Sequence, residues 1–129
     1  STVIAMHIRA LDALQHKEMF LDEEYYRKAL CKFMGQGSLT VDVYSDDSSY
    51  ARMLCSKIGD YEFRFPEEEV VLEPIQLLAK LSSYNRIIGS KSTLCWWASF
   101  LAELTQTNVQ VISPWEAHLN LETWTTIRT

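Results

Sequence analysis

The segment at residues 90–93 combines hydroxyl groups with the amine of Lys91, directly before an apolar pattern typical of a helix. A helix that starts at Ser92 and Thr93 would direct its first N–H groups, and the positive end of its dipole, toward a bound anion. Lys91 would add a full positive charge. Serine and threonine also serve as ordinary helix N-caps, so the segment fits either an anion site or a cap.

Two other groups of polar side chains could take part in the same chemistry. Arg9 could bind a phosphate through its planar guanidinium, or it could form a surface ion pair. His7 could act as a general base or be a hydrogen-bonded core histidine. Asp46 and Asp47 could accept hydrogen bonds from ribose hydroxyls or a base edge, or they could cap a helix or turn. Each group alone therefore fits both a binding and a structural role.

Strand and helix patterns alternate along the chain and position these groups. The expected strands are residues 2–8, 39–45, 61–65, 86–89 and 108–113, and the expected helices are residues 23–34, 49–58, 74–84 and 93–103. The connections are too long for hairpins, so we expect crossovers between parallel strands. The pattern predicts an α/β fold, with a Rossmann-like doubly wound parallel sheet of about five strands.

The three polar groups all follow the ends of expected strands. His7 and Arg9 end the first strand, Asp46 follows the second, and residues 90–93 follow the fourth. In open parallel sheets, ligands bind at the carboxyl ends of the strands. The sequence therefore predicts that these side chains line one crevice.

Composition narrows the class of protein. The 129 residues suit one domain, and a net charge of −5 without a run of basic residues disfavours nucleic-acid binding. No apolar run approaches the ~20 residues of a transmembrane helix. The acidic residues 67–69 are expected to form a solvated loop.

The remaining residue types do not predict metal or redox chemistry. Cys31, Cys55 and Cys95 are odd in number and far apart, and we expect them to be reduced thiols in the core. His16 and His118 have no cysteine or acidic partner at the spacing of metal ligands.

The order of several motifs adds a resemblance. The chain contains "HIR", "YYRKA", "VYSDD", "STLCWWASFLA" and "VISP" in that order. From about Val3 to Trp115 it resembles the carboxyl-terminal half of the α-1,2-fucosyltransferases of glycosyltransferase family 11. The "ST-x-x-WWA" element is the most specific part of this resemblance.

The resemblance implies a GT-B type enzyme whose Rossmann-like domain binds a GDP-sugar, typically GDP-fucose, without a metal or other cofactor. Arg9 and His7 are the catalytic residues it implies, and Arg9 would stabilise the departing diphosphate. The substrate-binding residues that it implies are Arg9, Asp12, Asp46, Lys91, Ser92 and Thr93.

The resemblance also implies a domain arrangement. Residues 1–113 would form the donor-binding domain and residues 114–129 a tail. Family members bind the glycan acceptor through a domain that precedes the H-x-R motif, so this chain alone is expected to be inactive. Another domain, or another subunit of an oligomer, would supply the acceptor site. The implied location is cytoplasmic, with membrane association through glycan biosynthesis.

The chain departs from the family pattern near its proposed site. The family's H-x-R-R-G-D-Y stretch lacks its second arginine, glycine and tyrosine here, which leaves donor affinity and sugar choice open. An acidic residue common on the helix before the "ST" element is replaced by Gln76, with Glu73 as the nearest substitute. Lys91 and Cys95 also replace the family's usual residues.

Two alternatives belong to other classes of protein. A receiver-like signalling module would use Asp46 or Asp47 as a phosphoacceptor, but it would also need an acidic pair where His7 and Arg9 stand. A degenerate relative of the glycosyltransferases could instead serve as an interaction surface.

Overall fold

The computed structural model describes residues 2–10, 21–59 and 61–128, and these form an α/β fold around a parallel sheet. The sheet order is β3-β2-β1-β4-β5-β6. The strands are β1 (Thr2–Ile8), β2 (Leu39–Ser45), β3 (Glu62–Arg64), β4 (Arg86–Ile88), β5 (Gln110–Ser113) and β6 (Thr125–Thr126). The helices are α1 (Glu23–Cys31), α2 (Ser48–Ile58), α3 (Pro74–Ser82) and α4 (Thr93–Thr105), with short 3-10 helices η2 (Pro66–Glu68) and η3 (Ala117–Leu119).

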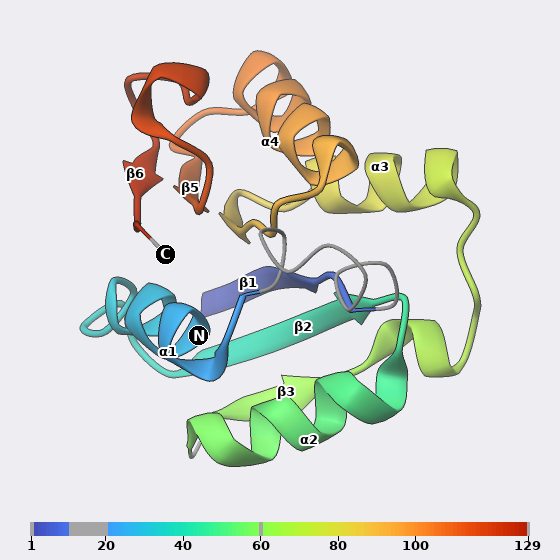
Figure 1. The fold of residues 1–129 in the computed structure, drawn as a ribbon. Helices are drawn as coiled ribbons and strands as arrows, with labels where there is room; N and C mark the ends of the chain where they lie inside the picture. Colours follow the sequence, from blue (N-terminus) through green and yellow to red (C-terminus); the bar gives the residue numbers. More distant parts are fainter. Residues whose placement is uncertain (1, 11–20, 60, 129) are drawn as a thin grey trace.

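This architecture confirms the predicted Rossmann-like doubly wound fold. All pairings within the sheet are parallel, and β1 pairs with both β2 and β4. The chain therefore crosses from one side of β1 to the other after β3 (Figure 1), which creates a crevice at the carboxyl ends of β1 and β4. The sheet gains a sixth strand, β6, that the sequence did not predict because it contains only two residues.

The starts of three helices follow from their capping residues. Asp22 and Asp47 accept hydrogen bonds from Tyr25 N and Tyr50 N, at 3.3 and 3.1 Å. At α3, Gln76 Oε1 accepts from Glu73 N at 2.9 Å, the reciprocal bond of a capping box. Helix α1 ends earlier than expected, at Cys31, and turns then lead to Gly35 and Gly37, which both adopt positive φ angles.

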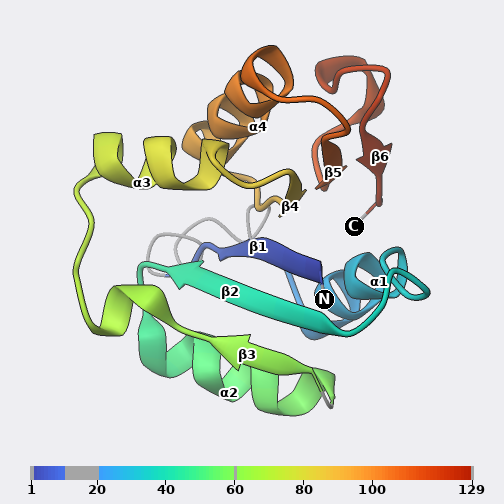
Figure 2. The ribbon, with the colours of Figure 1, turned by 180° about the vertical axis from the view of Figure 1, so that it is seen from behind.

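Helices α1 and α2 cover one face of the sheet, and α3 and α4 cover the other (Figures 1 and 2). On the first face, alternate side chains of β1 and β2, such as Met6 and Val43, pack against Tyr26 and Leu30 of α1. These side chains are almost completely buried. On the second face, Tyr44 packs in a cluster with the small residues of α4.

The tryptophans and cysteines divide between interior and surface. Trp96 stacks on Phe100 with ring centroids 5.5 Å apart, and its Nε1 donates to Leu119 O. Trp97, at the adjacent helical position, is 55% exposed. The expectation of core thiols is correct for Cys55 and Cys95 and wrong for Cys31, because Cys31 ends α1 on its solvent-exposed side.

Two further findings apply to residues 2–10, 21–59 and 61–128 only. None of their helices has the length and apolar character needed to cross a membrane. Their histidine, cysteine and acidic side chains also form no group suited to hold a metal ion.

Candidate functional site

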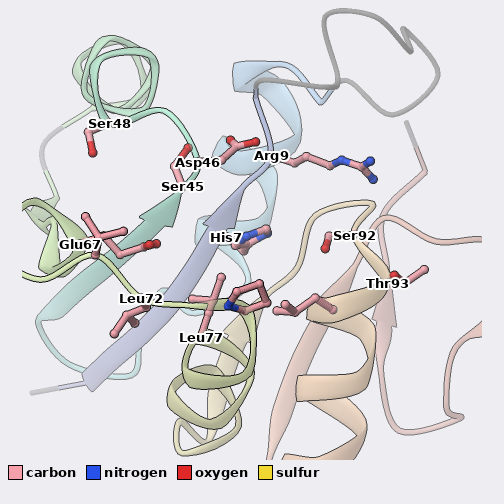
Figure 3. Close-up of a pocket in the computed structure, with 13 residues that line it drawn as sticks. His7, Arg9, Ser45, Asp46, Ser48, Glu67, Leu72, Leu77, Ser92 and Thr93 are labelled. Carbon is pink, nitrogen blue, oxygen red and sulfur yellow. The ribbon is translucent and has the colours of Figure 1, made fainter.

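A cavity of about 650 Å³ opens at the carboxyl ends of β1 and β2 and at the start of α4 (Figure 3). This volume lies within the range of small-molecule sites. Arg9, Ser92 and Thr93 lie on one side of the cavity, and Ser45, Asp46, Ser48 and Glu67 lie on the other. Leucine side chains from the loop before α3 and from α3 itself form an apolar wall between them. The predicted convergence of polar groups is therefore present in the fold.

Arg9 joins the end of β1 to the loop before α4. Its Nη1 donates a 2.6 Å hydrogen bond to the backbone oxygen of Lys91. A guanidinium has further N–H groups that can bind a phosphate at the same time. The bond to Lys91 thus fixes the loop and keeps the arginine at the wall of the cavity.

The start of α4 supplies donors on the same side of the cavity. Ser92 is the N-cap residue, but within the described residues its side chain accepts no hydrogen bond from the first turn. The ordinary capping role is therefore not what Ser92 performs here. The first backbone N–H groups of a helix, together with its dipole, favour an anion. Since Ser92 and Thr93 both line the cavity, an anion bound there could reach their hydroxyls as well.

His7 is buried beside this side of the cavity and is neutral near pH 7. Its Nδ1 lies 2.6 Å from Ser90 Oγ. Burial, opposed by Asp46 and assisted by Arg9, lowers the pKa of His7 to about 4. A neutral imidazole can donate or accept one hydrogen bond toward a ligand. With this low pKa, His7 is a weaker base than an ordinary histidine.

Two tyrosines of α1 hold the strand ends beneath the cavity, and the sequence patterns did not indicate this role. Tyr25 donates from its hydroxyl to Gly89 O at 2.6 Å, and Tyr26 donates to His7 O at 3.2 Å. Burial raises the pKa of both hydroxyls well above the ordinary value, so both remain donors. One sequence signal could have indicated this role: both tyrosines lie on the buried face of an amphipathic helix, and a buried hydroxyl requires a hydrogen-bond partner.

The two aspartates after β2 have different roles. Asp46 lines the cavity, and its Oδ1 accepts a 2.8 Å hydrogen bond from Ala10 N. Asp47 caps α2 instead. Asp46 thus ties the ends of β1 and β2 together beside the cavity, and only Asp46 of the pair is placed to contact a ligand.

The two remaining predicted site residues are Lys91 and Asp12. Lys91 lines a neighbouring cavity of about 590 Å³ together with Trp115, His118 and Arg128. Asp12 lies outside the described residues. The structure therefore brings together His7, Arg9, Asp46, Ser92 and Thr93 from the predicted set.

Glu67 also lines the cavity, and the sequence did not indicate it. The expectation of a solvated loop at residues 67–69 fits the exposed Glu68, which pairs with Arg52 at 2.6 Å. It is wrong for Glu67, which η2 places against the end of β2 and half buries. Burial raises the pKa of Glu67, although hydrogen bonds from the backbone of Ser45 and Leu72 oppose this.

A comparison with models of protein families assigns the chain to a family. A model of glycosyl transferase family 11 matches residues 1–123, which is most of the sequence. The chain belongs to glycosyl transferase family 11. This match confirms the resemblance drawn from the motifs, and membership implies an activated sugar donor and a glycan acceptor. Among curated proteins, none is similar enough to the chain to count as a match.

Proposed function

We propose that the cavity binds the GDP-sugar donor of an α-1,2-fucosyltransferase-like enzyme, with GDP-fucose as the donor. The observation that supports this most strongly is the position of Arg9, Ser92 and Thr93 on one wall of a cavity at the carboxyl edge of a Rossmann-like sheet. This is the edge at which nucleotides bind in such folds. Membership of glycosyl transferase family 11 supplies the reaction class.

In the proposed complex, the diphosphate lies against Arg9 and the start of α4. During transfer, an acceptor hydroxyl oxygen forms a bond to the anomeric carbon of the sugar while the bond from that carbon to the phosphate oxygen breaks. GDP leaves with the bonding electrons, and the acceptor proton passes to a base. Donors fixed before the reaction stabilise the charge that develops on the diphosphate. We propose that Arg9 and the helix start do this without a metal.

The neutral His7 fits a contact to the donor better than removal of the acceptor proton. With a pKa of about 4, its imidazole would hold that proton weakly. We therefore propose that the general base and the acceptor site come from elements outside residues 2–128, in another domain or subunit. Residues 2–128 would then bind the donor and remain inactive without that partner.

Isothermal titration calorimetry with GDP and GDP-fucose tests the proposal. Arg9→Ala should weaken binding of both by roughly 10- to 150-fold, the equivalent of about 1.5–3 kcal/mol for a charge-assisted hydrogen bond. Arg27→Ala is the matched control, because Arg27 is exposed on α1 and pairs with Glu23. Absence of GDP binding at millimolar concentration, or equal affinity in both variants, would overturn the proposal.

A further inference from the structure

Ser90 and His7 form a hydrogen bond between the ends of two neighbouring strands. Ser90 Oγ, in the loop after β4, lies 2.6 Å from Nδ1 of His7 on β1. Ser90 is 1% exposed and His7 is 7% exposed. A serine hydroxyl can donate or accept, and so can a nitrogen of a neutral imidazole, so the distance alone fits either direction. The direction of this bond decides which ring nitrogen of His7 carries the proton.

The surroundings of Ser90 determine that direction. Within residues 2–10, 21–59 and 61–128, His7 Nδ1 is the one hydrogen-bond partner of the Ser90 hydroxyl. If Nδ1 carried the proton, it would donate to Ser90, and the hydroxyl hydrogen of Ser90 would have no acceptor in a buried place. A buried donor without an acceptor costs more free energy than a typical hydrogen bond gains. The hydroxyl of Ser90 therefore donates to Nδ1.

The other ring nitrogen of His7 then carries the proton and faces the cavity. His7 is neutral near pH 7, so an unprotonated Nδ1 requires a proton on Nε2. His7 lines the cavity on the side of Ser92 (Figure 3). In the ranges that the structure describes, Nε2 has no hydrogen-bond partner, yet it is not sealed from water. The Nε2–H group is therefore available to a ligand.

We propose that Ser90 is a positioning residue, which holds His7 as its Nε2–H tautomer so that the ring donates a hydrogen bond to an oxyanion in the cavity. The identity of that oxyanion, a phosphate oxygen of the GDP-sugar, rests on the proposed function. Ser90 does not itself line the cavity and acts through His7 alone. An unprotonated Nε2 would present a lone pair to the anion instead of a donor.

The same tautomer gives a second reason why His7 does not act as the general base. The lone pair of the ring lies on Nδ1 and is occupied by the Ser90 hydroxyl. A sugar hydroxyl in the cavity meets Nε2–H, which has no lone pair to take its proton. The bond from Ser90 thus assigns His7 to binding.

Nitrogen NMR of the imidazole rings tests the tautomer directly, on the wild-type chain at pH 7 without ligand. Protonated and unprotonated ring nitrogens differ widely in chemical shift, and His7→Gln identifies the signals of His7 among the three histidines. We expect Nδ1 of His7 to be unprotonated and Nε2 to be protonated. A proton on Nδ1 in the wild type would overturn the inference.

Ser90→Ala and Ser99→Ala form a matched pair for the effect on binding. Ser99, on α4, is 2% exposed and donates to Cys95 O at 2.9 Å, so Ser99→Ala removes a buried hydroxyl without touching His7. Ser90→Ala should shift the Nδ1 signal of His7 and weaken pyrophosphate binding by roughly two- to tenfold, as for the loss of one hydrogen bond. Ser99→Ala should change neither. Thermal unfolding checks that both variants are folded.

The outcomes separate this inference from the proposed function. Pyrophosphate affinity that is unchanged in Ser90→Ala, or that falls equally in both variants, would overturn the role of Ser90. Pyrophosphate bound by a wild type with Nδ1–H would also overturn that role alone. Absence of pyrophosphate binding in a wild type that has the Nε2–H tautomer would instead contradict the proposed function.

Discussion

The two sides of the cavity differ in the direction of their hydrogen bonds. Arg9 and the start of α4 offer N–H and O–H donors, whereas Asp46 and Glu67 offer carboxylate oxygens. A nucleotide diphosphate has the complementary asymmetry, with an anion at one end and a base that can donate at the other. For the nucleotide that we propose as the ligand, this difference favours one orientation, with the diphosphate toward α4.

The two sides also differ in how they are built. We call the side with Arg9 and the start of α4 the donor side, because it offers hydrogen-bond donors. Tyr25 and Tyr26 fix it to the interior, since their hydroxyls bind the ends of β4 and β1. The opposite side, with the hydrogen-bond acceptors Asp46 and Glu67, is the acceptor side. It is built partly from η2 and the loop before α3, where Val70 and Val71 are exposed. We therefore expect changes on the donor side to affect stability as well as binding, and changes on the acceptor side to affect mainly selectivity.

Reversing the charge on the donor side should have the largest effect. Arg9→Glu places a carboxylate against the bound diphosphate, so pyrophosphate binding should fall by roughly 100-fold or more. Calorimetry at low salt measures this, with Arg27→Glu as the control on α1. If Arg9→Glu binds pyrophosphate like the wild type, the diphosphate does not lie on the donor side.

The next effect comes from the neutral His7 within the donor side. Its pKa is about 4 in the folded protein and 6.5 in an ordinary histidine, so the unfolded chain binds more protons between these values. Stability should therefore fall as pH decreases from about 6.5 to about 4, by up to about 3 kcal/mol from this group. Urea unfolding across this range, compared with His7→Gln, isolates the contribution. An identical pH slope in both proteins would contradict it.

Removing the hydroxyl of Tyr25 should lower the stability of the fold, because this hydroxyl supports the end of β4 beside the donor side. Tyr25→Phe leaves the backbone oxygen of Gly89 without its 2.6 Å bond in a buried place, at a cost of about 1–2 kcal/mol. Tyr61→Phe, at a half-buried tyrosine next to β3, should cost less. Urea unfolding at pH 7 measures both changes, and a larger loss in Tyr61→Phe would show that the tyrosine of α1 does not support the site.

The smallest effect is expected at the helix start. Thr93→Ala removes one neutral hydroxyl from the cavity and should weaken pyrophosphate binding by roughly two- to tenfold. Thr105→Ala, at the other end of α4, is the matched control. An unchanged affinity in Thr93→Ala would mean that backbone N–H groups alone hold the anion on this side.

The parts of the fold and of the cavity that could be predicted from the sequence are those that depend on residues close together in the chain. The alternation in β1 and β2 and the caps at Asp22, Asp47 and Glu73 are set by neighbouring residues. These local patterns were enough to predict that Arg9, Ser92 and Thr93 lie together at the carboxyl edge of the sheet, as they do. Glu67 could not be predicted, because its burial depends on η2 folding back onto the end of β2. The position of Lys91 in the second cavity also depends on how the loop before α4 turns.

The central claim is that one GDP molecule spans both sides of the cavity, and amide NMR during a GDP titration tests it most directly. We predict chemical-shift changes near Arg9, Ser92 and Thr93 together with changes near Glu67 and Leu72, whereas pyrophosphate should move only the first group. If GDP produced no change near either group, or only the changes that pyrophosphate produces, the account would be contradicted.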